Sequence, residues 1–342
     1  MSGEPDLHAA TGDDCLTAGE LLVAALRASW ERFMEQDALV YRRAPYPGGA
    51  GTEDSWRVAA VAAGDGVRAA SAGDVDHERV EAVHQARVAL RRIRSNVRVA
   101  NRLLDKAWAG AVAAETRWYA GRLGAVRDWD VLKARSQGAG SVVRSLAGPA
   151  ELTTFEVGLG TVLRCLDREI ASALDDLVAA RADARFEKLR VLMSGDLERA
   201  PLAGPASARW ADVMPRLISK QWRVLASRAD QALGEQDERA LHAVRVRVKR
   251  LRYAVDTMAP AGRGELRRFS RSAAALQDVL GEWHDSSVSQ AWLLAISPKV
   301  PPAATFVAGK LSVVEAELSS ASRARWPAAW STLRRSGGKL FS

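Results

Sequence analysis

Two rows of basic side chains, each beginning with a histidine, are the residues of this sequence best suited to bind an anion. Within each row the residues follow one another three or four positions apart. A helix turns about 100° per residue, so this spacing places each row along one face of a predicted helix. The first cationic row is His84, Arg87, Arg91, Arg94 and Arg98, and the second cationic row is His242, Arg245, Lys249 and Arg252.

Such rows are unfavourable for an isolated helix, because like charges four residues apart repel each other by a few tenths of a kcal/mol per pair, about 0.2 to 0.5. Carboxylates from another helix or an anionic ligand that spans several side chains would stabilise them. The alternative is a solvated basic face with ordinary salt bridges. Each histidine could equally be a partly buried hydrogen-bonding residue, and near neutral pH it can act as a neutral donor or as a further cation.

Acidic residues further along the chain could hold these cations in place. Asp128 and Asp130 follow Arg127, and Asp285 occupies the matching position in the second half of the chain. A carboxylate accepts paired hydrogen bonds from a guanidinium group, so we expect these three residues to orient arginines of the helices that carry the cationic rows. Two carboxylates two positions apart could instead share acid–base or metal chemistry. The tryptophans beside them, Trp129 and Trp283, are expected to pack rather than to stack on bases.

The elements that position these residues are predicted to be helices only. Ala, Leu, Arg and Glu recur at helical periodicity, and runs that alternate apolar with polar residues are almost absent. Thr17 and Glu20 form a capping box for the first helix. The predicted helices span about 17–40, 107–135, 151–181, 183–199, 207–233, 237–258 and 262–281, with helical structure onward to about 320. The helix of the first cationic row is expected to start where the acidic residues Asp74, Asp76, Glu78 and Glu81 gather.

The two halves of the chain have the same plan. Aligning His84 with His242 also aligns Arg87 with Arg245 and Arg91 with Lys249. We therefore predict an all-α protein in which an internal duplication forms two pseudo-symmetric helical bundles that face each other across a basic cleft. Pro201, Gly204 and Pro205 mark the boundary. The predicted units are a disordered acidic N-terminus (1–16), a first bundle (17–200) with an inserted loop (42–75), and a second bundle (205–342).

Composition favours an anionic partner and a soluble protein. The formal net charge is +8, the isoelectric point is near 9.8, and 48% of residues are hydrophobic. Cys15 and Cys165 are far apart and indicate neither a disulfide framework nor a zinc site. The acidic N-terminus is unlike a signal peptide, and the longest uncharged run, 286–298, is too short to span a bilayer. These features predict a cytoplasmic location.

The segments 83–95 (VHQARVALRRIRS) and 241–253 (LHAVRVRVKRLRY) resemble the two signature helices of the CHAD family, the conserved histidine α-helical domain. The elements Leu123–Asp128 and Leu280–Asp285 are also similar to that family. The resemblance covers about residues 17–341. It implies two helical bundles around a basic channel or cleft that binds inorganic polyphosphate, without an established enzymatic activity.

On this resemblance both histidines and the basic residues of the two rows are candidate phosphate contacts. Arg127 joins them, and so do Arg334 and Lys339, because residues 330–341 resemble the basic C-terminal element of the family. A frayed basic tail is the alternative for that last segment. The sequence departs from the family at His284, where Asn is common, and in the 42–75 insertion. No Glu-x-Glu-x-Lys segment precedes the first helix, which predicts a stand-alone binding module.

The sequence thus predicts non-enzymatic binding of inorganic polyphosphate, with no cofactor and no metal, and an association with polyphosphate granules. Nucleic-acid binding is the alternative, because the same cations could grip a DNA or RNA backbone. An enzyme with His84 or His242 as phosphoryl acceptor or metal ligand is disfavoured, since neither row has a second histidine at helical spacing and HExxH and Walker-type motifs are absent. The sequence leaves open the oligomeric state, the protein partners, the preferred polymer length and the role of the insertion.

Overall fold

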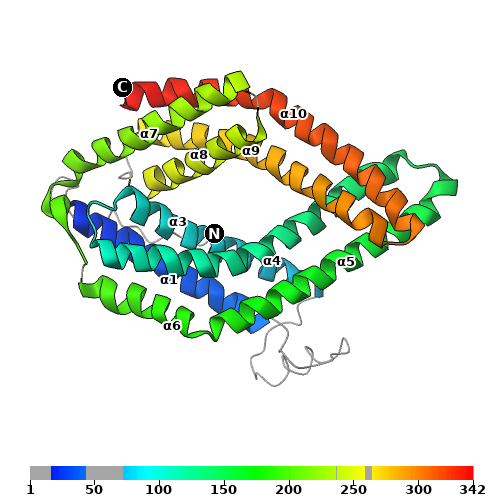
Figure 1. The fold of residues 1–342 in the computed structure, drawn as a ribbon, viewed down its shortest axis with the longest axis horizontal. Coiled ribbons are helices and arrows are strands. Elements are labelled where there is room, and N and C mark those ends of the chain that lie inside the picture. The colour runs from blue at the N-terminus through cyan, green and yellow to red at the C-terminus, as the bar shows by residue number, and fades with distance from the viewer. Residues whose placement is uncertain (1–16, 44–71, 200, 236, 259–263, 342) are drawn as a thin grey trace.

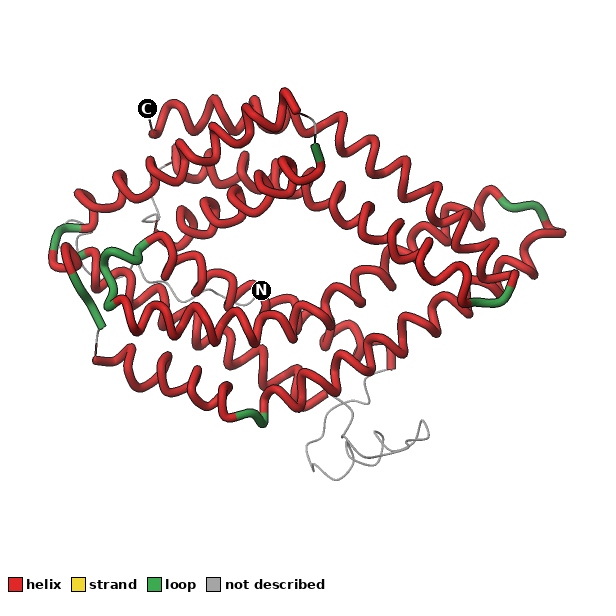
Figure 2. The backbone as a smooth tube through the Cα atoms, in the orientation of Figure 1, coloured by secondary structure: helices red, strands yellow, loops and turns green. Residues whose placement is uncertain are grey.

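The computed structural model describes residues 17–43, 72–199, 201–235, 237–258 and 264–341. Throughout these ranges the chain forms helices and no strand, so the predicted all-α fold is confirmed (Figure 2). The expected disordered N-terminus and nearly all of the expected insertion lie outside the described residues. None of the helices in these ranges is long and apolar enough to cross a membrane.

The described residues of the first half of the chain contain five α-helices. They are α1 (Ala18–Arg43), α3 (Ala72–Val99), α4 (Lys106–Leu146), α5 (Pro149–Arg181) and α6 (Ala184–Arg190). The predicted capping box is present: the backbone N–H of Glu20 donates to Oγ1 of Thr17 at 3.2 Å, and the backbone N–H of Thr17 donates to Oε2 of Glu20 at 2.9 Å. Asp105 caps α4 by accepting from the backbone N–H of Trp108 at 2.8 Å.

The second half contains α7 (Trp210–Glu235), α8 (Glu238–Met258), α9 (Gly264–Ile296) and α10 (Pro302–Phe341). Its helix order parallels that of α1, α3, α4 and α5, although the predicted duplication itself stays a prediction. In Figure 1 the helices of the two halves form an upper and a lower layer, which converge where α5 and α10 meet. α9 and α10 pack against each other, as α4 and α5 do in the first half.

Several predicted helices differ from the observed ones. α4 continues to Leu146, well beyond its predicted end near 135. α9 continues beyond Gly281 because Leu276, Leu280, Trp283 and Leu293 keep one buried face along its length. The last helix continues to Phe341 through Pro327, since the buried Trp326 and Trp330 on either side maintain its packing. The predicted helix 183–199 is instead α6 followed by a π-helical turn (Val191–Asp196) and a 3-10 turn (Leu197–Arg199), and the poor helix formers Ser194 and Gly195 lie in that turn.

Two hydrophobic clusters hold the halves together. The larger cluster contains buried residues of α1, α3, α7 and α8, so its apolar contacts cross the predicted boundary. The smaller cluster lies where α4 and α5 meet α9 and α10, and Phe155, Val162, Leu293 and Leu311 are among its buried members. Arg135 of α4 adds a polar link here, because its guanidinium pairs with Glu315 of α10 and with Glu282 of α9. The cationic rows therefore belong to one continuous packed body.

The segment between the halves packs back onto the first half. The backbone N–H of Ala203 donates to the carbonyl of Leu103 at 3.0 Å, and the N–H of Asp105 donates to the carbonyl of Pro201 at 2.9 Å. Gly204 has a φ of 59°, and a Cβ there would lie 2.8 Å from the carbonyl oxygen of Arg102. A residue without a side chain is therefore required at this turn.

Candidate anion-binding site

The two cationic rows lie on α3 and α8, and these helices pack against each other. On each helix the neighbouring face is buried: Ala86, Leu90 and Ile93 on α3 and Val244 and Val248 on α8 belong to the core. Most basic side chains of the rows are half-buried, while Arg98 and His242 are exposed. The cations therefore border the core, where solvent screens their charges less than on an open surface.

The rows converge at Lys249. Burial, followed by the charges of Arg245, Arg91 and Arg87, lowers the pKa of Lys249 to about 7 against the opposing effect of Asp285. Burial also lowers the pKa of Arg245, and its neighbouring charges again include Arg91 and Arg87 of α3. A side chain of α8 thus experiences the field of the first cationic row, which the linear sequence could not reveal.

Arg127 of α4 lies near His84 and near the arginines of the first cationic row. The pKa of the half-buried His84 is lowered first by burial and then by the charge of Arg127, with Glu81 opposing and the two nearest arginines of α3 adding to the effect. Three helices therefore supply one concentration of positive charge. We call it the first cation cluster, and it consists of Arg87, Arg91, Arg127, Arg245 and Lys249.

Two carboxylates lie within this cluster. Nη1 of Arg87 donates to Oδ1 of Asp128 at 2.7 Å, and Nη2 of Arg245 donates to Oδ1 of Asp285 at 3.4 Å. Nε of Arg245 is buried and has no hydrogen-bond partner within the described part of the chain. Two carboxylates leave the five cations with an excess of positive charge that an anion could balance.

Asp130 does not contact the cationic rows. It pairs with Arg79 of α3, whose Nη2 lies 2.9 Å from its Oδ1 and 2.7 Å from Oδ1 of Asp76. The side chains of Arg79 and Asp130 are 7% and 1% exposed, so this pair lies in the interior. Asp130 therefore pairs with an arginine of the helix that carries the first cationic row, although Arg79 is not a member of that row.

The histidines differ in their surroundings. The rings of His242 and His284 lie 5.3 Å apart between centroids. The pKa of His284 is lowered to about 4 by burial and by the positive charges of Arg245, His242 and Lys249. His284 is therefore neutral near pH 7, where it offers one hydrogen-bond donor and one acceptor.

Three residues of the cationic rows, Arg94, Arg98 and Arg252, lie outside the first cation cluster. Arg94 and Arg98 continue along α3, beyond the first cation cluster. The guanidinium of Arg252 lies 5.1 Å from the ring centroid of Tyr253, and its Nε lies 3.9 Å from Asp256 of the same helix. Three basic residues near Arg94 and Arg98 were not among the predicted contacts: Arg117, Arg247 and Arg250. Of these three residues, Arg250 could have been suspected from the sequence because it lies within the signature segment 241–253.

The predicted C-terminal contacts belong to a packed helix rather than to a frayed tail. Nη1 of Arg334 lies 3.0 Å from Asp230 of α7, and Lys339 is exposed one turn beyond it. Gly337 lies against Trp222 so closely that a Cβ would approach the ring to 2.3 Å. The structure therefore places Arg334 and Lys339 on the part of α10 that packs against α7.

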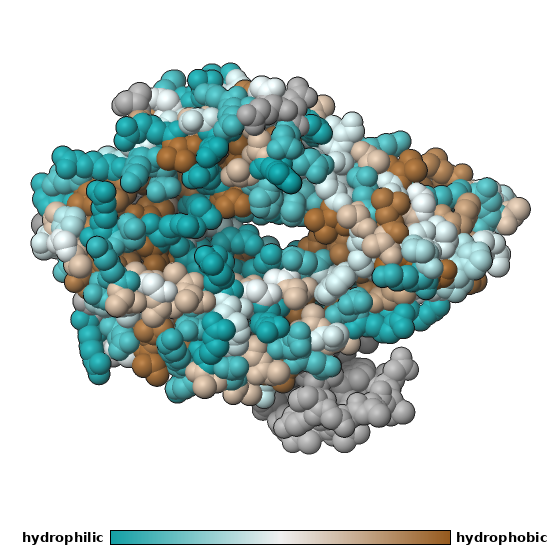
Figure 3. All heavy atoms as spheres, in the orientation of Figure 1, coloured by the Kyte–Doolittle hydropathy of each residue, from teal (hydrophilic) through white to brown (hydrophobic). Residues whose placement is uncertain are grey.

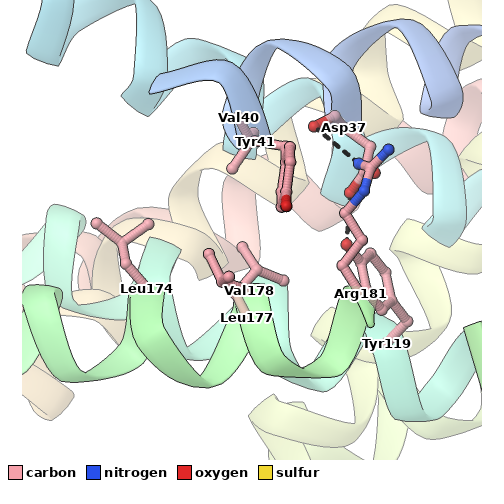
Figure 4. Close-up of a pocket in the computed structure, with 8 residues that line it drawn as sticks. All are labelled: Asp37, Val40, Tyr41, Tyr119, Leu174, Leu177, Val178 and Arg181. Atoms are coloured by element: carbon pink, nitrogen blue, oxygen red, sulfur yellow. Dashed lines mark hydrogen bonds and ion pairs between the residues drawn. The ribbon is translucent and has the colours of Figure 1, made fainter. Parts of the chain in front are cut away.

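A separate small hollow lies between α1, α4 and α5 (Figure 4). The Tyr119 hydroxyl donates to Oδ1 of Asp37 at 2.5 Å, and Arg181 pairs with the same carboxylate. Burial raises the pKa of Asp37, although both partners oppose this effect. The hollow has a volume of about 10 Å³ and is too small for a ligand larger than one water molecule. Within the described ranges no group of three His, Cys, Asp or Glu side chains is arranged to hold a metal ion.

The space-filling view is hollowed near its centre, between the layers formed by the two halves (Figure 3). A family model for the CHAD domain matches residues 59–294. The chain belongs to the CHAD domain family. The resemblance of the two signature helices is thereby confirmed.

Two relatives of this CHAD domain chain come from Mycobacterium tuberculosis. They are the uncharacterized protein MT2285 of strain CDC 1551 / Oshkosh and the uncharacterized protein Rv2226 of strain ATCC 25618 / H37Rv. Each is 32% identical over 268 residues, which cover 73% of this chain and 47% of the relative. The chain spans about half the length of these relatives, so the predicted stand-alone organisation stays a prediction.

Two solved structures have the same fold as this chain. The CHAD domain from the plant Ricinus communis superposes with a TM-score of 0.66 at 22% identity, over 96% of this chain and 97% of the other. PptA from Streptomyces chartreusis superposes with a TM-score of 0.62 at 19% identity, over 92% of this chain and all of the other. At these identities the likeness shows the all-α fold alone.

Proposed function

We propose that this protein binds inorganic polyphosphate along the surface that α3, α4 and α8 form. The observation that carries this proposal is the meeting of the two cationic rows, where Lys249 of α8 lies in the field of Arg87 and Arg91 of α3. A linear phosphate polymer carries closely spaced negative charges along its whole length. Arginine side chains with planar, multidentate donors suit such a ligand.

The chemistry of the surface supports a polymer without bases over a nucleic acid. Single-stranded nucleic acids are usually held by aromatic side chains on which bases stack. Tyr253 and Trp283, the aromatic residues within or beside the second row, are both buried. Trp129 packs against Trp292, with ring centroids 6.2 Å apart. The cations would therefore grip a nucleic-acid backbone without a platform for its bases.

The proposal is one of binding and assigns no catalytic step to any residue. Affinity would come mainly from counterion release and would fall steeply with salt. A protein of this kind would associate with polyphosphate granules, and the cytoplasmic location expected from composition is compatible with that role.

A titration tests the ligand class. Polyphosphate and single-stranded RNA at equal phosphate concentration should compete for the protein at several salt concentrations, with polyphosphate binding more tightly. The variant Arg87→Gln/Arg91→Gln/Arg245→Gln should bind polyphosphate more weakly. Its plot of log affinity against log salt should be flatter by about 0.7 to 0.9 for each lost phosphate contact.

The matched control removes the same number of exposed arginines from α4 and α5, away from the rows: Arg122→Gln/Arg164→Gln/Arg168→Gln. It should leave affinity and salt dependence nearly unchanged. Equal losses in both triple variants would show that only net charge matters and would refute the site. Displacement of polyphosphate by RNA at equal phosphate concentration would favour the nucleic-acid alternative.

A further inference from the structure

A second group of arginines lies beyond the first cation cluster and draws its members from the same three helices. We call it the second cation cluster, and it consists of Arg94 and Arg98 of α3, Arg117 of α4, and Arg247 and Arg250 of α8. α3 packs against both α4 and α8, so these residues come together through helix packing. Arg94 and Arg98 are four positions apart and Arg247 and Arg250 three, so each pair shares a side of its helix.

The electrostatics of this cluster agree with that placement. Burial lowers the pKa of Arg250, and with the charges of Arg98, Arg247, Arg94 and Arg117 it brings this pKa to about 10. Burial likewise lowers the pKa of Arg94, followed by the charges of Arg117, Arg91 and Arg98. The largest charge effects on these two side chains therefore come from other arginines.

Carboxylates distinguish the two clusters. The first cation cluster contains Asp128 and Asp285 within hydrogen-bond distance of its arginines. In the described part of the chain, no carboxylate forms an ion pair with a member of the second cation cluster. Neither is there an Asp or Glu three or four positions before or after any of its five residues.

An ordinary solvated face does not account for this arrangement. Arg94, Arg247 and Arg250 are half-buried, so water screens their mutual repulsion only in part. Arginine remains charged even when its pKa is lowered to about 10. The cluster therefore costs stability in the free protein, and a bound anion would remove that cost.

The two clusters are continuous along α3. Arg91 lies between them, because its charge acts on Lys249 and Arg245 in the first cluster and on Arg94 in the second. From Arg87 to Arg98 the helix rises about 16 Å, at roughly 1.5 Å per residue. One anion can occupy both clusters only if it extends over a distance of this order.

We infer that the second cation cluster is a distinct phosphate-binding subsite, which only a long phosphate chain occupies together with the first cation cluster. This inference rests on the proposed function. Simultaneous occupation adds contacts within one molecule, so a long chain gains affinity that a short one lacks. The second cation cluster thereby gives the protein a preference for long polyphosphate.

The experiment measures the affinity of the full chain for long-chain polyphosphate and for tripolyphosphate. The decisive quantity is the ratio of the two affinities, compared between the wild type and the variant Arg117→Gln/Arg250→Gln. Long-chain affinity should fall on the order of a hundredfold, about tenfold for each lost charged contact. Tripolyphosphate affinity should fall much less, because the first cation cluster remains available, and the ratio should drop accordingly.

The matched control is Arg164→Gln/Arg168→Gln, which removes two exposed charges from α5 and should leave the ratio unchanged. Thermal unfolding without ligand checks the fold: the midpoint of Arg117→Gln/Arg250→Gln should not fall, since the substitutions remove like charges. An unchanged ratio, with long-chain affinity either intact or reduced in step with tripolyphosphate affinity, would overturn the inference. Failure of the wild type to bind long-chain polyphosphate at all would instead refute the proposed function.

Discussion

Lys249 should oppose folding at neutral and acidic pH, and replacing it should stabilise the free protein. Its pKa of about 7 in the folded chain compares with an ordinary value of 10.5. A lysine with a lowered folded-state pKa costs stability in full below that pKa, and the cost shrinks as pH rises from about 7 to 10.5. A difference of one unit between the folded-state and unfolded-state pKa corresponds to about 1.4 kcal/mol in the free energy of unfolding. The cost is therefore about 5 kcal/mol at pH 6 and about 2 kcal/mol at pH 9.

The variant Lys249→Met tests this reasoning, because methionine retains the length of the side chain without its charge. Urea denaturation should show a gain in the free energy of unfolding that is about 3 kcal/mol larger at pH 6 than at pH 9. Comparing the two proteins at each pH cancels groups that titrate in both. A gain of equal size at the two pH values would refute the assignment of the lowered pKa to Lys249.

The same residue links pH to ligand binding. An anion beside Lys249 favours its charged form, so binding near pH 7 should take up a proton. Polyphosphate affinity should then decline as pH rises from 6 to 9 in the wild type, and it should decline less in Lys249→Met. Calorimetric titration in two buffers with different ionisation enthalpies measures the proton uptake directly. Equal heats in both buffers, after correction for dilution, would contradict it.

Two further predictions concern groups near the cationic rows. Asp130→Asn should reduce the free energy of unfolding by about 3 to 5 kcal/mol in thermal or urea unfolding, because Arg79 would keep a buried charge without its main partner. Asp128→Asn should reduce it by about 1 kcal/mol or less, because Asp128 is exposed. Equal losses in the two variants would be inconsistent with the burial of Asp130. His284 has a pKa of about 4 in place of 6.5, so it should lower the free energy of unfolding as pH falls from 6.5 to 4, by up to about 3 kcal/mol and by less to the extent that solvent screens the half-buried ring. His284→Asn should make the decline of stability over this range shallower, and an unchanged pH profile would show that His284 does not cause it.

Much of this architecture could be predicted because it depends on local periodicity. The capping box of Thr17 and Glu20 and the course of α3 and α8 follow from residues a few positions apart. The spacing of the two rows likewise requires only the pitch of a helix. Helix ends were harder to predict: the helices expected to end near 281 and 320 continue to Ile296 and Phe341, because buried faces continue past the predicted ends.

Helical periodicity in the sequence sets which residues share a helix face, and the packing of the helices sets which of those faces meet. The partner of Asp130 is Arg79 rather than a member of the rows because the turn of α4 and its contact with α3 select it. Arg117, Arg247 and Arg250 join Arg94 and Arg98 only because three helices pack together. The lowered pKa of Lys249 has the same origin. Burial of its side chain, and the charges of arginines far away in the sequence, act on it only after folding. Helical periodicity is local, whereas desolvation and the field of other helices depend on packing across the whole molecule.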